Sequence, residues 1–246
     1  MTSRREFLKT SAGGVLLAGA GPLASGFANA AIPGLRPELS EGARDSAVLE
    51  ALPGKFPLIN NSYRPPNYET PVEYFREPFT PNKAFFVRYH LSHIPEVDAT
   101  QWRLKVGGDS AATPFELTLD ELKRNFEPVE LVAICQCSGN RRGLFQPHVA
   151  GVEWGPGAMG NARWKGARLK DLLAKAGIKK EAVEITLNGA DGGVVDKTPD
   201  FVKSLPMAKA LDENTLVAYE MNGEPLPHWN GFPSASSSRA GPAPTG

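Results

Sequence analysis

Short apolar stretches separated by turn residues recur along this chain. Leu131 to Cys135 form one such stretch, and the Ser138-Gly139 pair after it marks a turn, which predicts a core strand that enters a loop. The same reasoning predicts strands at residues 85–91, 102–106, 183–187 and 216–221. After the last of these, Asn222-Gly223 predicts a tight hairpin turn.

Two short helices are predicted from capping and periodicity. Thr118 and Glu121 have the spacing of a capping box, so a helix is expected from there to Phe126. A second helix is predicted where four apolar residues share one helical face and Gly177 can supply the left-handed residue that ends it. The four residues are Leu169, Leu172, Leu173 and Ala176. Strands interspersed with short helices, with no internal repeat, predict an α+β domain with a mixed sheet.

Residues 31–80 differ from the rest of the chain because they are rich in proline and lack a periodic apolar pattern. They are predicted to form an extended arm over the surface of the main domain, residues 81–233. The chain has 27 basic and 27 acidic residues, which gives no electrostatic reason to expect nucleic acid or a membrane surface as a partner.

The N-terminus has the pattern of a twin-arginine signal peptide. Arg4-Arg5 precede a weakly apolar stretch at residues 12–27, and Ala28-Asn29-Ala30 is a small-x-small cleavage site. A basic tail, the alternative, leaves that site unexplained. Residues 1–30 are therefore predicted to direct the folded protein through the twin-arginine translocase to the periplasm. About 216 residues remain after removal of these 30, within the range of one compact domain.

The loop after the 131–135 strand contains the chemically most informative residues. A thiolate at Cys137 beside Arg141 and Arg142 would be suited to binding a metal. The two guanidinium groups are suited to phosphate or another oxyanion, because arginine offers planar, paired donors. The sequence thus predicts a soft metal and a phosphorylated ligand in one site. Cys135 lies in the apolar strand and is predicted to pack in the core.

This loop, Cys137-Ser138-Gly139-Asn140-Arg141-Arg142, resembles the cofactor loop of the sulfite oxidase family of molybdenum enzymes. Three further segments resemble that family, at residues 85–91, 155–166 and 222–233, so the resemblance spans about residues 50 to 233. It implies a sulfite-oxidase-type molybdopterin-binding fold and a molybdenum-molybdopterin cofactor.

The resemblance also implies a role for each matching residue. Cys137 would be the single protein ligand to molybdenum, and Arg88 and Arg142 would face the substrate oxyanion. The residues implied at the pterin cofactor are His90, Asn140, Asp191 and Asn230. Asn230 stands where animal relatives have a histidine that contacts the pterin.

The function implied by the resemblance is the oxidation of sulfite to sulfate in the periplasm, with electrons passed to a c-type cytochrome. The sequence has no Cys-x-x-Cys-His motif for haem attachment, so the haem is expected on that partner. Two alternatives remain, a sulfoxide-reductase-like enzyme of the same superfamily and an inactive, truncated remnant. The full-length family members are expected to form homodimers.

Residues 234–246 consist mostly of Ser, Ala, Pro and Gly and are predicted to be disordered. One DNA stretch can encode two different peptides in two reading frames. In the first frame it encodes Leu-Arg-Val-Ile-Val-Pro-Gly-Trp-Thr-Gly-Thr-Tyr-Trp-Met, which resembles a strand and loop of the family. Without its first base, the same stretch encodes the whole tail and then a stop codon. A frameshift after Pro233 is therefore inferred, with a natural polar linker as the alternative. The domain would then be incomplete, with an unpaired edge at residues 216–221 that favours aggregation.

Overall fold

The computed structural model describes residues 49–238, which belong to one compact unit. The predicted signal peptide and residues 239–246 lie outside the described residues. Helices and sheets are both present, which confirms the α+β class. In the described part every strand pairing is antiparallel, whereas the sequence analysis expected a mixed sheet. No helix within residues 49–238 is long and apolar enough to cross a membrane.

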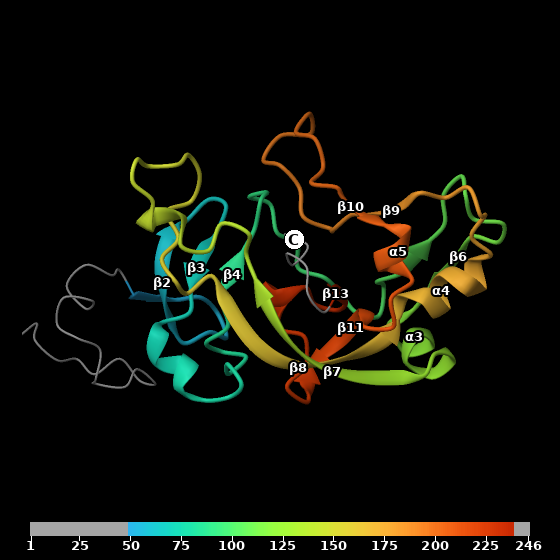
Figure 1. The fold of residues 1–246 in the computed structure, drawn as a ribbon, viewed down its shortest axis with the longest axis horizontal. Helices are drawn as coiled ribbons and strands as arrows, with labels where there is room; N and C mark the ends of the chain where they lie inside the picture. Colours follow the sequence, from blue (N-terminus) through green and yellow to red (C-terminus); the bar gives the residue numbers. More distant parts are fainter. Residues whose placement is uncertain (1–48, 239–246) are drawn as a thin grey trace, which may run out of the picture. The chain divides into compact units, whose positions relative to one another are not determined.

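The largest sheet has the order β12-β11-β8-β7, with β13 also paired to β11. Its strands are β7 (Pro128–Gln136), β8 (Met159–Arg168), β11 (Thr215–Met221), β12 (Glu224–Pro225) and β13 (Ala235–Ser238). β7 and β8 pair along nine residues, from Pro128 opposite Ala167 to Gln136 opposite Met159, and form the long ribbon pair in the lower part of Figure 1. This pair delivers residue 137 and residue 158 to the same end of the sheet.

Strand β7 has one exposed face, although the sequence predicted a core strand. Among the described residues β7 pairs only with β8, so it is an edge strand. Because side chains alternate between the two faces of a strand, Val132 and Ile134 point to solvent and are 44% and 57% exposed. The alternate residues Ala133 and Cys135 pack against the core cluster that contains Trp154.

A second sheet contradicts the predicted surface arm. It has the order β1-β2-β3-β4, formed by β1 (Leu49–Ala51), β2 (Pro57–Ser62), β3 (Asn67–Glu69) and β4 (Val87–Arg88). The 3-10 helix η1 (Val72–Arg76) follows β3. Leu58, Tyr68 and Val87 form a buried cluster of their own. Each of these short strands is stabilised by pairing with the next, and β3 pairs with β4, which no local periodicity indicates. Residues 31–48 lie outside the described part.

Smaller elements surround the two sheets. The remaining strands form two hairpins, β5 (Leu104–Val106) with β6 (Phe115–Leu117) and β9 (Glu184–Leu187) with β10 (Lys203–Pro206). The helices are α3 (Leu119–Asn125), α4 (Leu169–Ala176) and α5 (Met207–Ala210), with 3-10 turns η2 (Arg142–Leu144) and η3 (His228–Asn230). β4 and β5 are shorter than the predicted strands at residues 85–91 and 102–106.

The predicted local signals are confirmed. The Thr118 hydroxyl accepts from the Glu121 amide at 3.1 Å, and the Glu121 carboxylate accepts from the Thr118 amide at 2.8 Å, which completes the capping box. Gly177 ends α4 with a φ of 63°. Asn222 and Gly223 have φ values of 54° and 82°, as a tight hairpin turn between β11 and β12 requires.

Strand β13 corrects the prediction for the tail. Residues 235–238 pair with β11, from Ala218 opposite Ala235 to Thr215 opposite Ser238, so they are not disordered. β11 thus has β8 on one edge and β12 and β13 on the other, and the expected unpaired edge is wrong. Strand pairing uses backbone groups that every non-proline residue carries, so a Ser/Ala segment can complete the sheet.

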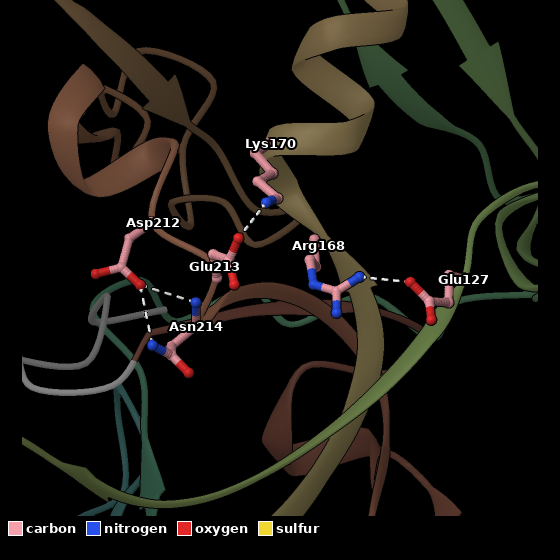
Figure 2. Close-up of polar contacts among 6 residues, drawn as sticks. All are labelled: Glu127, Arg168, Lys170, Asp212, Glu213 and Asn214. Carbon is pink, nitrogen blue, oxygen red and sulfur yellow. Dashed lines mark hydrogen bonds and ion pairs between the residues drawn. The ribbon is translucent and has the colours of Figure 1, made fainter.

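Polar contacts hold the other end of this sheet (Figure 2). Arg168 at the end of β8 pairs with Glu127 at 2.6 Å, and Lys170 in α4 pairs with Glu213 at 2.8 Å. Asp212 accepts from the backbone and side-chain amides of Asn214 at 2.8 and 3.2 Å. Since both carboxylates are largely exposed to water, the two ion pairs contribute little to stability.

Candidate functional site

The Cys137 loop follows directly from β7. Cys137 is a free cysteine that is 5% exposed, and the Gly139 amide donates to its Sγ at 3.4 Å. The Asn140 amide donates to the Cys137 carbonyl at 3.0 Å, which closes a tight turn. Arg141 has a left-handed φ of 69°, and its amide donates to Gly155 O at 2.8 Å. The loop therefore presents one buried thiol from a fixed backbone.

The Arg142 side chain lies against two glycines of this loop region. A Cβ atom at Gly139 would come within 2.7 Å of Arg142 Nη1, and one at Gly151 within 2.6 Å. Arg142 Nη1 also donates to Val152 O at 3.4 Å. The absence of a side chain at both glycines leaves the room that the guanidinium occupies.

Arg88 connects β4 to the Cys137 thiol. The pKa of Arg88 is lowered, mainly by burial and also by the charge of Arg142. The charge of the Cys137 side chain and a hydrogen bond with it act in the opposite direction and raise the pKa of Arg88. Arg88 Nη1 donates to Asn67 Oδ1 at 3.3 Å. Arg88, predicted from a segment separate from the Cys137 loop, is thus brought to Cys137 and Arg142.

His90 lies beside Arg88 on the segment after β4. Arg88 Nη2 hydrogen-bonds His90 Nδ1, and the His90 ring stacks on Phe201 with the ring centroids 3.6 Å apart. Partial burial, together with the charges of Arg88 and Lys203, lowers the pKa of His90 to about 4. The imidazole is therefore neutral at physiological pH.

Asp191 is brought to the same segment by the loop after β9. His93 and Gly192 exchange two backbone hydrogen bonds, of 2.9 and 2.8 Å, and the Leu91 amide donates to Asp191. Burial raises the pKa of Asp191, and the charge of Asp200 raises it further. The structure therefore places Asp191 next to the segment that carries Arg88 and His90.

Asn140 and Asn230 make contacts within the protein. Asn140 Oδ1 accepts from the Ala158 amide at 3.1 Å, while the Cys137 amide donates to Ala158 O at 2.9 Å. Asn230 Oδ1 accepts from Lys55 Nζ at 2.5 Å, and its Nδ2 donates to Phe86 O at 2.9 Å. Both residues hold neighbouring segments, and their contact with a cofactor stays a prediction.

Lys55 was missed by the sequence analysis because it lies in the segment taken as a surface arm. It is 7% exposed, and its ammonium donates to Asn82 O at 2.8 Å and Phe85 O at 3.0 Å besides Asn230. Burial lowers the pKa of Lys55 to about 7. Its partners lie 27 to 175 residues away in the sequence, so no local signal could have indicated this role.

Glu69 in β3 was missed for the same reason. It is 3% exposed and accepts from the amides of Gly155 at 2.5 Å and Gly157 at 2.9 Å and from Asn61 Nδ2 at 2.8 Å. Gly155 O in turn accepts from the Arg141 amide. Glu69 thus anchors the 155–158 loop against which the Cys137 loop is built.

Several buried polar atoms around this site have no hydrogen-bond partner within residues 49–238. They include Arg88 Nε, Asp191 Oδ2 and Trp154 Nε1, and buried polar atoms are normally bonded. In the described part no three His, Cys, Asp or Glu side chains gather as a metal cluster. A soft metal bound through Cys137 and carried by a polar, anionic organic group fits these donors, because the thiol is soft and the nearby guanidiniums are cationic.

Comparison with known proteins agrees with this chemistry. The family described as oxidoreductase molybdopterin binding domain matches residues 90–235. Mitochondrial sulfite oxidase from Homo sapiens is 40% identical over 189 residues, which cover 74% of this chain and 34% of the human protein. Mitochondrial sulfite oxidase from Rattus norvegicus is 39% identical over 210 residues, which cover 80% of this chain and 38% of the rat protein. Nitrate reductase [NADH] 1 from Oryza sativa subsp. japonica is 33% identical over 219 residues, which cover 82% of this chain and 22% of the rice protein.

A solved structure shows the same fold. The sulfane dehydrogenase SoxCD from Paracoccus pantotrophus superposes with a TM-score of 0.63 at 25% identity, over 89% of this chain and 52% of that chain. The chain spans about a third of the length of the sulfite oxidases that it matches. Because the family match covers more than half of the chain and includes the Cys137 loop, the chain belongs to the oxidoreductase molybdopterin binding domain family, whose cofactor contains molybdenum.

Proposed function

We propose that this protein is a molybdenum-dependent oxidoreductase that converts sulfite to sulfate. The observation that carries the proposal is that two arginines flank the Cys137 thiol. Arg88 hydrogen-bonds the thiol, and the Arg142 guanidinium lies against Gly139, whose amide donates to Cys137 Sγ. Two permanent cations beside a single metal-binding sulfur suit a small, doubly charged oxyanion that reacts at a metal centre. The similarity to sulfite oxidases, about 40% identity, exceeds that to the rice nitrate reductase at 33% and favours sulfite as the substrate.

The reaction removes two electrons from sulfite and adds one oxygen atom, which comes from water with the release of two protons. When bound, the cofactor would supply the oxygen transfer and accept the two electrons, with Cys137 as the protein ligand of its metal. Arg88 and Arg142 would bind the substrate oxygens and neutralise their charge. His90, neutral at physiological pH, would present ring nitrogens without adding a further charge.

The electron acceptor and the location belong to the same proposal. A c-type cytochrome would take the electrons one at a time, two molecules for each sulfite oxidised. Arg4-Arg5 and the Ala28-Asn29-Ala30 site support export to the periplasm by the twin-arginine translocase. The sulfoxide-reductase-like alternative is the competing activity to be assayed.

The test combines metal content with activity. The full chain is expressed in a host that makes the cofactor, its cell fraction is determined, and molybdenum per chain is measured by mass spectrometry. Sulfite-dependent reduction of cytochrome c is then followed, with ferricyanide as a second acceptor and with nitrate and a sulfoxide as competing substrates.

Two matched cysteine variants provide the control. Cys137→Ser is expected to lose molybdenum and sulfite oxidation, because oxygen is a harder donor than a thiolate. Cys135→Ser is expected to keep both, because burial raises the pKa of Cys135 to about 12 and this thiol stays protonated. Equal losses in two folded variants, or a molybdenum-loaded protein that oxidises no sulfite with either acceptor, would contradict the proposal.

A further inference from the structure

Lys203 is a basic residue near the site that the proposed mechanism does not use. Its ammonium lies 4.4 Å from the centroid of the Phe201 ring, in a cation–π contact. The same Phe201 ring stacks on His90 with 3.6 Å between the ring centroids and 14° between the ring planes. One aromatic ring therefore connects Lys203 to the imidazole that Arg88 contacts, and it restrains a side chain that is otherwise flexible.

The backbone fixes this arrangement from two directions. Lys203 is the first residue of β10 and pairs with Leu187 at the end of β9. The loop that leaves β9 returns to the segment after β4, where Gly192 pairs with His93. Lys203 and His90 thus lie on two segments that are tied together, which agrees with the effect of the Lys203 charge on the pKa of His90.

Among the described residues, no ion pair neutralises the charge of Lys203. Within residues 49–238, Lys203, Arg88 and Arg142 form no salt bridge with a carboxylate. Asp191 and Asp200 lie on the neighbouring loop, but the Leu91 amide donates to Asp191 and Asn188 Nδ2 donates to Asp200 at 3.1 Å. Lys203 is exposed, so its field reaches an anion that approaches from solvent.

We infer that Lys203, held on the Phe201 ring, is a specificity-determining residue that attracts doubly charged tetrahedral or pyramidal oxyanions to the site. The inference rests on the proposed function, because it names how the substrate of that reaction is selected. Lys203 acts on binding and not on the chemical step. Its effect falls with ionic strength, because an exposed charge is screened within about 8 Å at physiological salt.

The first experiment measures anion binding without turnover. Sulfate, which carries the same charge as sulfite, is titrated into the full chain labelled with ¹⁵N-histidine at low ionic strength, and the His90 ring signals are followed. Lys203→Met is expected to weaken sulfate binding about threefold to tenfold, and Lys203→Arg to restore it. Lys180→Met, an exposed lysine beyond α4, makes the same change in net charge and is expected to bind sulfate like the parent chain.

The second experiment measures turnover as a function of salt. In the holoenzyme, Lys203→Met is expected to raise KM for sulfite by a similar factor, leave kcat unchanged and flatten the salt dependence of kcat/KM. A Lys203→Met variant that matches Lys180→Met in sulfate affinity overturns the inference, whether or not the parent oxidises sulfite. A protein that oxidises no sulfite but shows the Lys203-dependent sulfate binding overturns the proposed function alone.

Discussion

Replacement of Glu69 by alanine tests whether a buried carboxylate holds the site together. The substitution removes the acceptor of the Gly155 and Gly157 amides and of the Asn61 side chain. A buried donor left without a partner costs about 1 to 3 kcal/mol. Gly157 is buried, whereas Gly155 is only half-buried and water can partly replace its partner. The two backbone donors together therefore give an expected loss of about 2 to 4 kcal/mol in the free energy of unfolding.

The size of this loss matters because a domain is stable by only about 5 to 15 kcal/mol. Glu69→Gln keeps the shape and one acceptor oxygen but turns an NH₂ group toward one of the two amides, so about 1 to 3 kcal/mol should be lost. Both variants should also bind less molybdenum, since the 155–158 loop supports Arg141 and Cys137 through backbone hydrogen bonds.

Urea unfolding followed by tryptophan fluorescence gives the free energy, and mass spectrometry gives the molybdenum per chain. Glu116→Ala is the matched control, because Glu116 also lies in a β-strand but is exposed. Its one ion pair within residues 49–238 is with Lys105 at 3.5 Å. That variant should lose less than about 1 kcal/mol. If the free energy of unfolding of Glu69→Ala lies within about 0.5 kcal/mol of that of Glu116→Ala, and Glu69→Ala keeps its molybdenum, the anchoring role of Glu69 is wrong.

Three further outcomes are expected. Arg88→Met and Arg142→Met should each raise KM for sulfite about ten- to a hundredfold while most of the molybdenum is retained. The reason is that a charge-assisted hydrogen bond is worth about 1.5 to 3 kcal/mol. An unchanged KM in both variants would reject the role of the two arginines in substrate binding. The pKa of Lys55 is about 7 in the folded chain and 10.5 in the unfolded chain. Between pH 7 and 10.5 the unfolded chain therefore binds more protons than the folded chain. The free energy of unfolding should rise with pH over this range, by up to about 5 kcal/mol. The Lys55→Met variant should lack this rise. If the free energies of unfolding of parent and variant change in parallel from pH 7 to 10.5, the lowered pKa of Lys55 is wrong. A chain that ends at Ser234 should unfold at lower urea concentration, because β11 loses the pairing with Ala235–Ser238; an equal midpoint would mean that β13 contributes nothing.

The sequence by itself determined the features that depend on neighbouring residues. The Thr118 capping box, the left-handed Gly177 and the Asn222-Gly223 turn each depend on contacts within a few residues, and all three are present. The Cys137 loop was likewise recognisable, because its chemistry lies in six consecutive residues. Local geometry and side-chain type are sufficient in these cases.

The tertiary structure alone decided what depends on partners far along the chain. Lys55 binds Asn230 across 175 residues, and Glu69 binds Gly155 across 86. Strand β3 pairs with β4, and β13 pairs with β11, although the residues of β3 and β13 carry weak strand signals of their own. Lys203 meets His90 for the same reason, through Phe201. A contact between distant residues closes a long loop of the chain, which costs conformational entropy. This cost is offset only when many such contacts form together in the complete fold.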